Sequence, residues 1–311
     1  MANNYATTAA NLSGGFSHLT VRGMPLTQVH SGEVFWVGNA TTAGNVNEVG
    51  GSDTTGHGTF MKPFATIQKG IDACTASRGD IVFVKPGHAE TVAGTSTTSN
   101  ILLNNAGVAV VGLGTGASRP TLTFSAAAST IGLSAANMTV SNILFKANFL
   151  DVAAAITVVA AATPTDFTIQ NCEFRDNSTI LTFVSAVVGN ATANSADGFT
   201  FDNNRVFGIA AVPAAACTAV VMDKAQIRQS YKDNYIVHTV AKNDTAVLLA
   251  IGNNIHLWLE VARNKVFRPS TDTVGGSLIS GAGGTACTGY VYDNYSWHLD
   301  NGAALLIPTG K

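Results

Sequence analysis

The chain has 311 residues, of which 46% are hydrophobic and only 12% are charged, with 31 glycines and a formal net charge of −2. This composition is too apolar for a disordered chain and too poor in charge for a coiled coil. Because Lys and Arg form no cluster, we expect no nucleic-acid partner. Because no run of about 18 apolar residues occurs, we also expect no membrane-spanning helix.

The first 32 residues show little hydrophobic periodicity, and we interpret residues 1–32 as an N-terminal arm. The arm lacks the cationic stretch followed by an apolar core that marks a secretory signal, so we expect synthesis and folding in a cytoplasm. The four cysteines are far apart and form no CxxC pair. They are therefore expected to be buried thiols, with no disulfide framework, metal site or cofactor. These cysteines are Cys74, Cys172, Cys217 and Cys287.

Residues 33–79 are expected to form an N-terminal cap that includes one helix. From Phe64 to Cys74 an apolar residue recurs every three or four positions, which is the period of an amphipathic helix. Pro63 suits the first turn of such a helix and Gly79 lies just past its end, so we predict a helix over 63–76. A strand-like run, DIVFVKP, begins directly afterwards at Asp80.

From Asp80 onward the sequence repeats with a period of 30 residues or slightly more. The clearest copies are FTFDNNRVFG from Phe199, QSYKDNYIVH from Gln229, LEVARNKVFR from Leu259 and GYVYDNYSWH from Gly289. An asparagine occupies the same place in each copy: Asn204, Asn234, Asn264 and Asn294. Earlier segments extend this column back to Cys172, Ile143 and Val111.

A fixed period of this size, built from short Val/Ile/Phe/Tyr runs without a helix, predicts an all-β solenoid. Each coil would stack on the next at about 4.8 Å, the spacing between strands. Residues 80–311 would then form about eight coils. The low charge fits this stacking, because like charges in register on adjacent strands repel one another.

We expect the asparagine column to be structural and to lie at a corner between strands. Asn tolerates the left-handed backbone that a sharp corner needs, and stacked amides can form hydrogen bonds along the column. An active-site role for these asparagines is the alternative.

Charged residues also fall into columns, with Asp233, Arg263 and Asp293 at one position on successive coils. They could form a surface salt-bridge ladder, or two carboxylates around an arginine could form a sugar site. Glu173 and Arg205 fall into the next column in the same way and favour the ladder. Asp202 has no matched partner in the sequence.

Aromatic residues occupy a further column, where Tyr235 and Tyr295 lie with Lys265 between them. Such a column could bind sugar rings or pack against a neighbouring subunit. Trp297 could belong to the same contact surface. Because Trp258 and Trp297 follow apolar columns, we interpret both as core or interface residues.

One part of the sequence resembles a known class of protein. It contains a Gly-rich loop with Asp53, then Pro-Phe-Ala-Thr-Ile at Pro63–Ile67, then a strand ending at Pro86–Gly87, and VVGLGTG follows from Val110. This pattern resembles the right-handed parallel β-helix proteins of the pectate-lyase-like class, and among them the phage-encoded members. The resemblance implies a right-handed parallel β-helix with an N-terminal capping helix.

The resemblance also implies a function, although the class contains lyases, hydrolases, tailspikes and non-enzymatic virion proteins. The scattered acidic residues favour a protein without catalytic residues. We therefore expect a phage virion structural protein, a homotrimer on the capsid exterior that binds the major capsid protein as a decoration protein. The alternative is a tail-associated β-helix protein that binds glycans or degrades polysaccharide.

Overall fold

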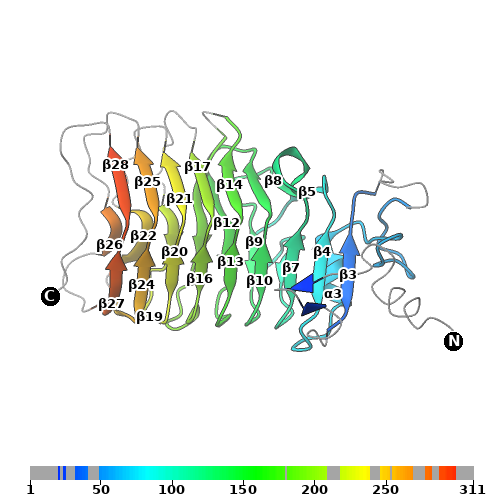
Figure 1. The fold of residues 1–311 in the computed structure, drawn as a ribbon, viewed down its shortest axis with the longest axis horizontal. Helices are drawn as coiled ribbons and strands as arrows, with labels where there is room; N and C mark the ends of the chain where they lie inside the picture. Colours follow the sequence, from blue (N-terminus) through cyan, green and yellow to red (C-terminus); the bar gives the residue numbers. More distant parts are fainter. Residues whose placement is uncertain are drawn as a thin grey trace.

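The computed structural model describes residues 20–21, 24–25, 32–40, 49–178, 181–208, 218–238, 246–252, 254–268, 277–281 and 287–298. These residues form three long parallel sheets, and the chain visits the three in turn on each coil. Figure 1 shows the strands stacked side by side along the long axis, from β3 at one end to β27 and β28 at the other. The predicted parallel β-solenoid is confirmed.

Within the described ranges, sheet I has nine strands: β3 (Val34–Val37), β4 (Ile81–Val84), β7 (Ala109–Gly112), β10 (Thr139–Ser141), β13 (Thr168–Gln170), β16 (Thr200–Asp202), β20 (Ser230–Lys232), β24 (Leu259–Ala262) and β27 (Gly289–Tyr292). Sheet II has eight there: β5 (Ala89–Val92), β8 (Thr121–Phe124), β11 (Leu144–Ala147), β14 (Glu173–Asp176), β17 (Arg205–Gly208), β21 (Tyr235–His238), β25 (Lys265–Arg268) and β28 (Tyr295–His298). Sheet III has seven: β6 (Leu102–Leu103), β9 (Ile131–Leu133), β12 (Val152–Val158), β15 (Phe183–Val188), β18 (Thr218–Val221), β22 (Ala246–Gly252) and β26 (Ser277–Gly281).

Two smaller strand pairs and a short 3-10 helix complete the described secondary structure. The strands β19 (Gln226–Ile227) and β23 (His256–Leu257) pair in parallel on the way from sheet III back to sheet I. The strands β1 (Thr20–Val21) and β2 (Met24–Pro25) form a two-residue antiparallel ladder. The rest of the predicted arm up to residue 31 lies outside the described residues.

The 30-residue register is confirmed in both sheets that it predicts. In sheet I the stacked residues are Phe201, Tyr231, Val261 and Val291, and in sheet II they are Phe207, Val237, Phe267 and Trp297. The extension to Val111 is wrong. Val111 pairs with Ser141, two residues before the column at Ile143. The corner between β7 and β8 is longer than later corners and contains the 3-10 helix η1 (Gly116–Ser118), so counting residues misplaces the column.

Stacked apolar side chains fill the inside of the solenoid. Phe145 and Phe174 on adjacent coils stack with ring centroids 4.7 Å apart and planes 7° apart, and Phe167 stacks on Phe199 at 6.0 Å and 9°. All four rings are buried. Like residues in register thus place one coil's ring against the next, which is how a chain with few charges forms a continuous core.

The cap contains the predicted helix, α3 (Ile67–Ala73), but it is shorter than residues 63–76. Phe64 is extended, because its backbone forms a parallel β-bridge with Val37 at the end of β3. The helix therefore begins after Thr66, whose side chain accepts a hydrogen bond from the Lys69 N–H. It ends at Cys74, where the backbone becomes extended. Local periodicity cannot reveal the bridge, so it overestimates the helix.

Two carboxylates attach α3 to its surroundings. The Asp53 carboxylate accepts hydrogen bonds from the Ala65 and Thr66 N–H groups, and Glu90 of β5 accepts one from the Ile67 N–H. Both satisfy backbone donors that a helix start leaves without intrahelical partners. The helix is thereby held over the first coils, with Ile67 and Ile71 buried against them.

Candidate functional surfaces

The asparagine column lies inside the corner between sheets I and II. Each Oδ1 accepts a backbone N–H from the column residue one turn earlier, at 2.9–3.0 Å. Each Nδ2 donates to a sheet I carbonyl on the earlier turn, at 2.9 Å. Asn204, Asn234 and Asn264 are buried, and Asn294 is half-buried. These bonds use both ends of each amide, and they support the structural interpretation over an active-site role.

The backbone prediction for this column was wrong by one position. The left-handed residues are the preceding ones, Asn203, Asp233, Arg263 and Asp293, with φ between 50 and 56°. The asparagine is therefore kept by its hydrogen bonds rather than by its tolerance of positive φ. Asn and Asp suit the preceding position, while an arginine there is unusual.

A bidentate salt bridge with Asp233, one turn earlier, holds the Arg263 side chain at the corner. Arg263 Nε donates a hydrogen bond to Asp233 Oδ1 at 2.8 Å, and Arg263 Nη2 donates one to Asp233 Oδ2 at 2.6 Å. These hydrogen bonds lower the pKa of Asp233 and raise that of Arg263. The expected salt-bridge ladder is thus present only between Asp233 and Arg263, and Asp293 forms no ion pair with a described residue.

Asp202 has a charged neighbour that the sequence did not reveal. It ends β16 and lies diagonally across from Asp233 on the next turn, because Asp202 pairs with Lys232. Burial, and then the negative charge of Asp233, raise the pKa of Asp202. Its Oδ1 is buried without a hydrogen-bond partner among the described residues. The pKa values of the two carboxyl groups are therefore shifted in opposite directions, a pattern that can mark an acid and a base.

Glu173 and Arg205 pair in backbone register, but the expected side-chain pair between them is wrong. The Glu173 carboxylate instead contacts Arg119, at 3.1 Å, and Arg175. Glu173 is buried under these two cations, and the exposed Arg205 guanidinium lies over the ring of Phe207, 5.1 Å from its centroid. Arginine on an aromatic face is a stable alternative to an exposed ion pair.

The aromatic column is confirmed in register, and it is wider than the sequence suggested. Tyr235, Lys265 and Tyr295 stack in that order on the outer face of sheet II. Phe207 and Phe267 join the two tyrosines in one chain of ring contacts. Strand alternation could have revealed these two residues, because the intervening Val206 and Val266 are buried and their neighbours must point outward.

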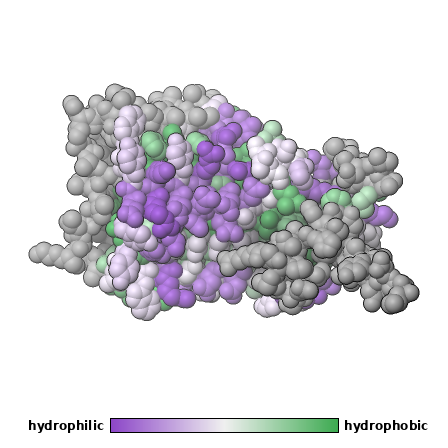
Figure 2. All heavy atoms as spheres, viewed as in Figure 1, coloured by the Kyte–Doolittle hydropathy of each residue, from purple (hydrophilic) through white to green (hydrophobic). Residues whose placement is uncertain are grey.

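Four exposed aromatic side chains gather on the final described turn, and we call them the C-terminal aromatic belt. Their exposed fractions are 76% for Tyr290, 41% for Tyr292, 53% for Tyr295 and 41% for Trp297. The belt flanks the hydrophilic corner, where Figure 2 shows polar side chains gathered in the half of the molecule that contains β16 to β28. Trp258 is 65% exposed, so it is not a core residue, and the alternative that it is an interface residue stays a prediction.

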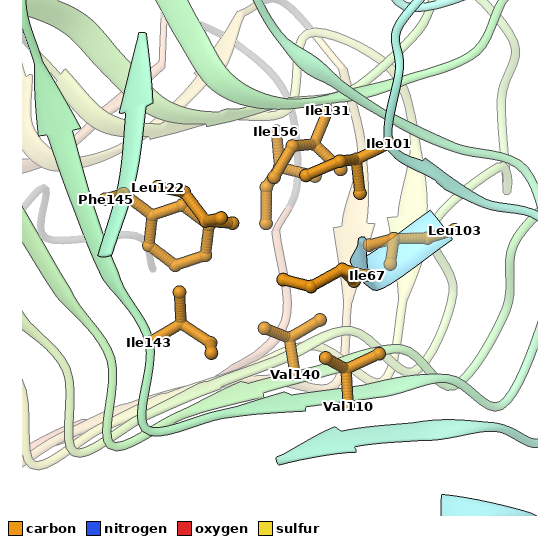
Figure 3. Close-up of a pocket in the computed structure, with 10 residues that line it drawn as sticks. All are labelled: Ile67, Ile101, Leu103, Val110, Leu122, Ile131, Val140, Ile143, Phe145 and Ile156. Atoms are coloured by element: carbon orange, nitrogen blue, oxygen red, sulfur yellow. The ribbon is translucent and has the colours of Figure 1, made fainter. Parts of the chain in front are cut away.

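An internal cavity between α3 and the first coils holds only about 10 Å³. Figure 3 shows the side chain of Ile67 directed into it toward aliphatic residues of the sheets. All ten lining side chains are apolar: Ile67, Ile101, Leu103, Val110, Leu122, Ile131, Val140, Ile143, Phe145 and Ile156. A space of this size without polar partners stays dry, so it is a packing gap and not a ligand site.

A buried polar network lies near the β19–β23 pair. Gln229 Oε1 accepts from the Tyr231 hydroxyl at 3.2 Å and from His256 Nδ1 at 3.1 Å, which assigns the Nδ1 proton. All three side chains are buried. Burial lowers the pKa of His256 and raises that of Tyr231.

Several other expectations concern metals, thiols and membranes. Among the described side chains, no three of His, Cys, Asp or Glu gather closely enough to hold a metal ion. Cys74 and Cys172 are buried free thiols whose pKa is raised to about 12, mainly by burial, and Cys287 is half-buried. Cys217 lies outside the described residues. In the described part of the chain, no helix is long and apolar enough to cross a membrane.

The chain has no match among protein-family models, curated proteins or solved structures. The structure itself defines the class of protein, which is a parallel β-solenoid of the β-helix kind.

Proposed function

We propose that the protein is a non-enzymatic structural protein of a virus particle, made in the host cytoplasm, that decorates the outside of the assembled capsid. The observation that carries this proposal is the C-terminal aromatic belt. Clustered exposed aromatic side chains are typical of surfaces that bind another protein. The belt lies on β27 and β28, which are the last strands of sheets I and II among the described residues. The resemblance to phage β-helix proteins suggests a capsid as the partner.

The belt also suits contact between copies of the chain. A symmetric oligomer buries the same patch on each subunit around a closed axis. A trimer would match the threefold positions of a capsid shell, and each subunit would contact the major capsid protein. Light scattering of the purified full chain tests for the trimer, and a monomer at all concentrations would contradict it.

The charged residues nearest the corner support a structural function, because several of them pair with one another. Asp233 pairs with Arg263, and Glu260 accepts hydrogen bonds from Tyr292, at 2.8 Å, and from Lys232, at 3.1 Å. The Tyr292 hydroxyl, followed by Lys232, lowers the pKa of Glu260. These contacts hold adjacent coils together.

Quantitative mass spectrometry of purified particles of the encoding virus tests the proposal. We expect a copy number comparable to that of capsid subunits, and a handful of copies would indicate the tail instead. The double variant Tyr290→Ser/Trp297→Ser should fail to bind undecorated particles. Phe149→Ser is the matched control, because Phe149 is also an exposed aromatic residue but lies outside the belt. Equal binding by both variants would contradict the role of the belt.

A second candidate function is polysaccharide hydrolysis at the corner, favoured by Asp202 and Asp233. One carboxyl with a raised pKa could donate a proton while the other stays ionised. The test is the release of new reducing ends from capsular polysaccharide by the intact protein. Turnover that is lost in Asp202→Asn and retained in Asp223→Asn would establish this second function over the first.

A further inference from the structure

The outer face of sheet II presents a line of aromatic rings and cations. On β17, β21 and β25 the residue between two outward side chains is apolar and buried, as Val206, Ile236 and Val266 show. Val237, the second outward side chain of β21, lies between Phe207 and Phe267 in register. We call the aromatic and cationic side chains of this face the aromatic–cationic strip: Arg175, Arg205, Phe207, Tyr235, Lys265 and Phe267. Strand alternation alone fixes their common direction.

The rings of the strip form a zigzag along the solenoid axis. Ring centroids lie 5.9 Å apart for Phe207 and Tyr235, and 5.2 Å apart for Tyr235 and Phe267. Interplanar angles of 53° and 40° show that neighbouring rings are tilted and do not stack face to face. All three rings are only half-buried. The strip therefore offers apolar ring surface on three successive turns.

The strip is positively charged as well as aromatic. The Arg205 guanidinium lies over Phe207 and also over Tyr235, 5.8 Å from the second centroid, and Lys265 follows Tyr235 in register. Neither Arg205 nor Lys265 forms an ion pair with a residue that the structure describes. The adjacent carboxylate, Glu173, is already neutralised by Arg119 and Arg175. The complementary ligand is a polymer with apolar ring faces and negative charge.

The spacing of the cations distinguishes two kinds of polyanion. Arg205 and Lys265 are two turns apart, which is about 10 Å along the axis. A nucleic-acid strand in a duplex carries a charge about every 3.4 Å, much more densely than the strip can neutralise. A polysaccharide with a carboxylate on only some of its sugars has the sparser charge that the strip matches.

We propose that the aromatic–cationic strip binds an acidic polysaccharide laid along the solenoid axis, with sugar rings on Phe207, Tyr235 and Phe267 and carboxylates beside Arg205 and Lys265. This binding function differs from capsid attachment. The strip residues lie on coils before the final turn, and the strip meets the belt where Phe267 contacts Tyr295, with ring centroids 5.8 Å apart. It requires no reaction, and the polysaccharide leaves unchanged.

Calorimetric titration of the full chain with three polymers tests the proposal: hyaluronan, with a carboxylate on alternate sugars; alginate, with one on every sugar; and dextran, with none. We expect hyaluronan and alginate to bind, dextran not to bind, and added salt to weaken the binding. Tyr235→Ala and Lys265→Gln should each weaken binding about tenfold, the loss expected when one stacked ring or one charge contact is removed. Tyr235→Phe and Lys265→Arg should retain most of the affinity.

Matched controls are Trp258→Ala, which removes an exposed ring elsewhere, and Lys69→Gln, which removes a cation from α3. Both should bind like the original chain, and melting temperatures will show whether each variant is folded. Failure of both acidic polymers to bind would overturn the proposal. So would tighter binding of single-stranded poly(dT), or a change of oligomeric state in Tyr235→Ala without a change in polysaccharide affinity. Since none of these readouts uses virus particles, the result is independent of the capsid proposal.

Discussion

Asn234 donates both its backbone N–H, at 3.0 Å, and its side-chain N–H, at 2.9 Å, to Oδ1 of Asn264 one turn further along the solenoid. The same side chain donates to the Phe201 carbonyl, and its Oδ1 accepts the Asn204 N–H. One buried amide therefore contacts an N–H and a carbonyl of the preceding turn and also donates to the following turn. The column joins sheets I and II along the corner.

Replacing Asn234 should destabilise the solenoid measurably. Asn234→Leu leaves the Asn204 N–H without a partner and removes one hydrogen bond from the Phe201 carbonyl. We expect the free energy of unfolding to fall by about 1–3 kcal/mol, the cost of a buried unpaired group. Asn234→Asp should lose more at pH 7, because a buried carboxylate cannot donate. Burial would raise the pKa of that carboxyl, so its stability should recover as the pH falls. Chemical denaturation at pH 4 and pH 7 checks both expectations.

Asn171→Asp is the matched control, because Asn171 lies at an exposed, left-handed corner position and only accepts, from Asn203 Nδ2. An aspartate keeps that acceptor, so the free energy of unfolding should change by less than about 0.5 kcal/mol. If Asn234→Asp is no more destabilising than Asn171→Asp, the column does not stabilise the corner.

Ile67→Asp should detach the cap helix. Ile67 is buried against the dry cavity of Figure 3, so the new carboxylate would have no partner there. We expect the free energy of unfolding to fall by about 3–5 kcal/mol, as it does for an unpaired buried charge. Lys69→Asp places the same carboxylate in the same helix at a half-buried position and should be nearly neutral. Equal melting temperatures for the two variants would contradict the role of α3 as a cap of the solenoid.

Gly70→Ala should destabilise the protein although alanine is the better helix former. An added Cβ would lie 2.7 Å from Val82 Cγ1 and 3.0 Å from Val37 Cγ2. The gain in helix propensity is about 1 kcal/mol, whereas overpacking against stiff valines costs about 1–3. Calorimetry should show a lower melting temperature. The loss should shrink in a Val82→Ala background, and an unchanged loss there would contradict the steric explanation.

Stability should fall as the pH drops below about 6.5, and His256 should contribute to the fall. Burial lowers its pKa below the ordinary 6.5, with partial compensation from the Met222 and Ile251 carbonyls. The unfolded chain therefore binds a proton that the folded chain does not, so the free energy of unfolding decreases toward acid. The slope from one such group is at most about 1.4 kcal/mol per pH unit. His256→Gln should show a shallower decrease between pH 7 and pH 5, and an identical slope would exclude His256 as its source.

The fold could be predicted from the sequence because stacking in register repeats similar residue types at the same position of every turn. The spacing of Asn204, Asn234 and Asn264 predicted their column correctly. It could not show which of two adjacent corner residues has the left-handed backbone, since Asn203 and Asn204 are the same residue type. Arg263 at that position would not be expected from backbone preference, and only the contact with Asp233 explains it.

The candidate surfaces were harder to predict because they depend on contacts between turns. Tyr235 and Tyr295 were predicted from the period, whereas Phe207 and Phe267 were not predicted as members of the contact surface, although their rings face outward. Asp202 lies 31 residues before Asp233, one position off the repeat, so a search within columns does not pair them. The β-bridge at Phe64 is likewise a tertiary contact, and it shortens a helix that the local pattern extends.

The most direct test of the proposed function is a cryo-electron microscopy map of the intact virus particle. We expect trimers of β-solenoid rods on the outer capsid surface, with coils spaced about 4.8 Å apart and the aromatic belt at a protein contact. Rods found only in the tail, or particles that contain no such rods, would contradict the account.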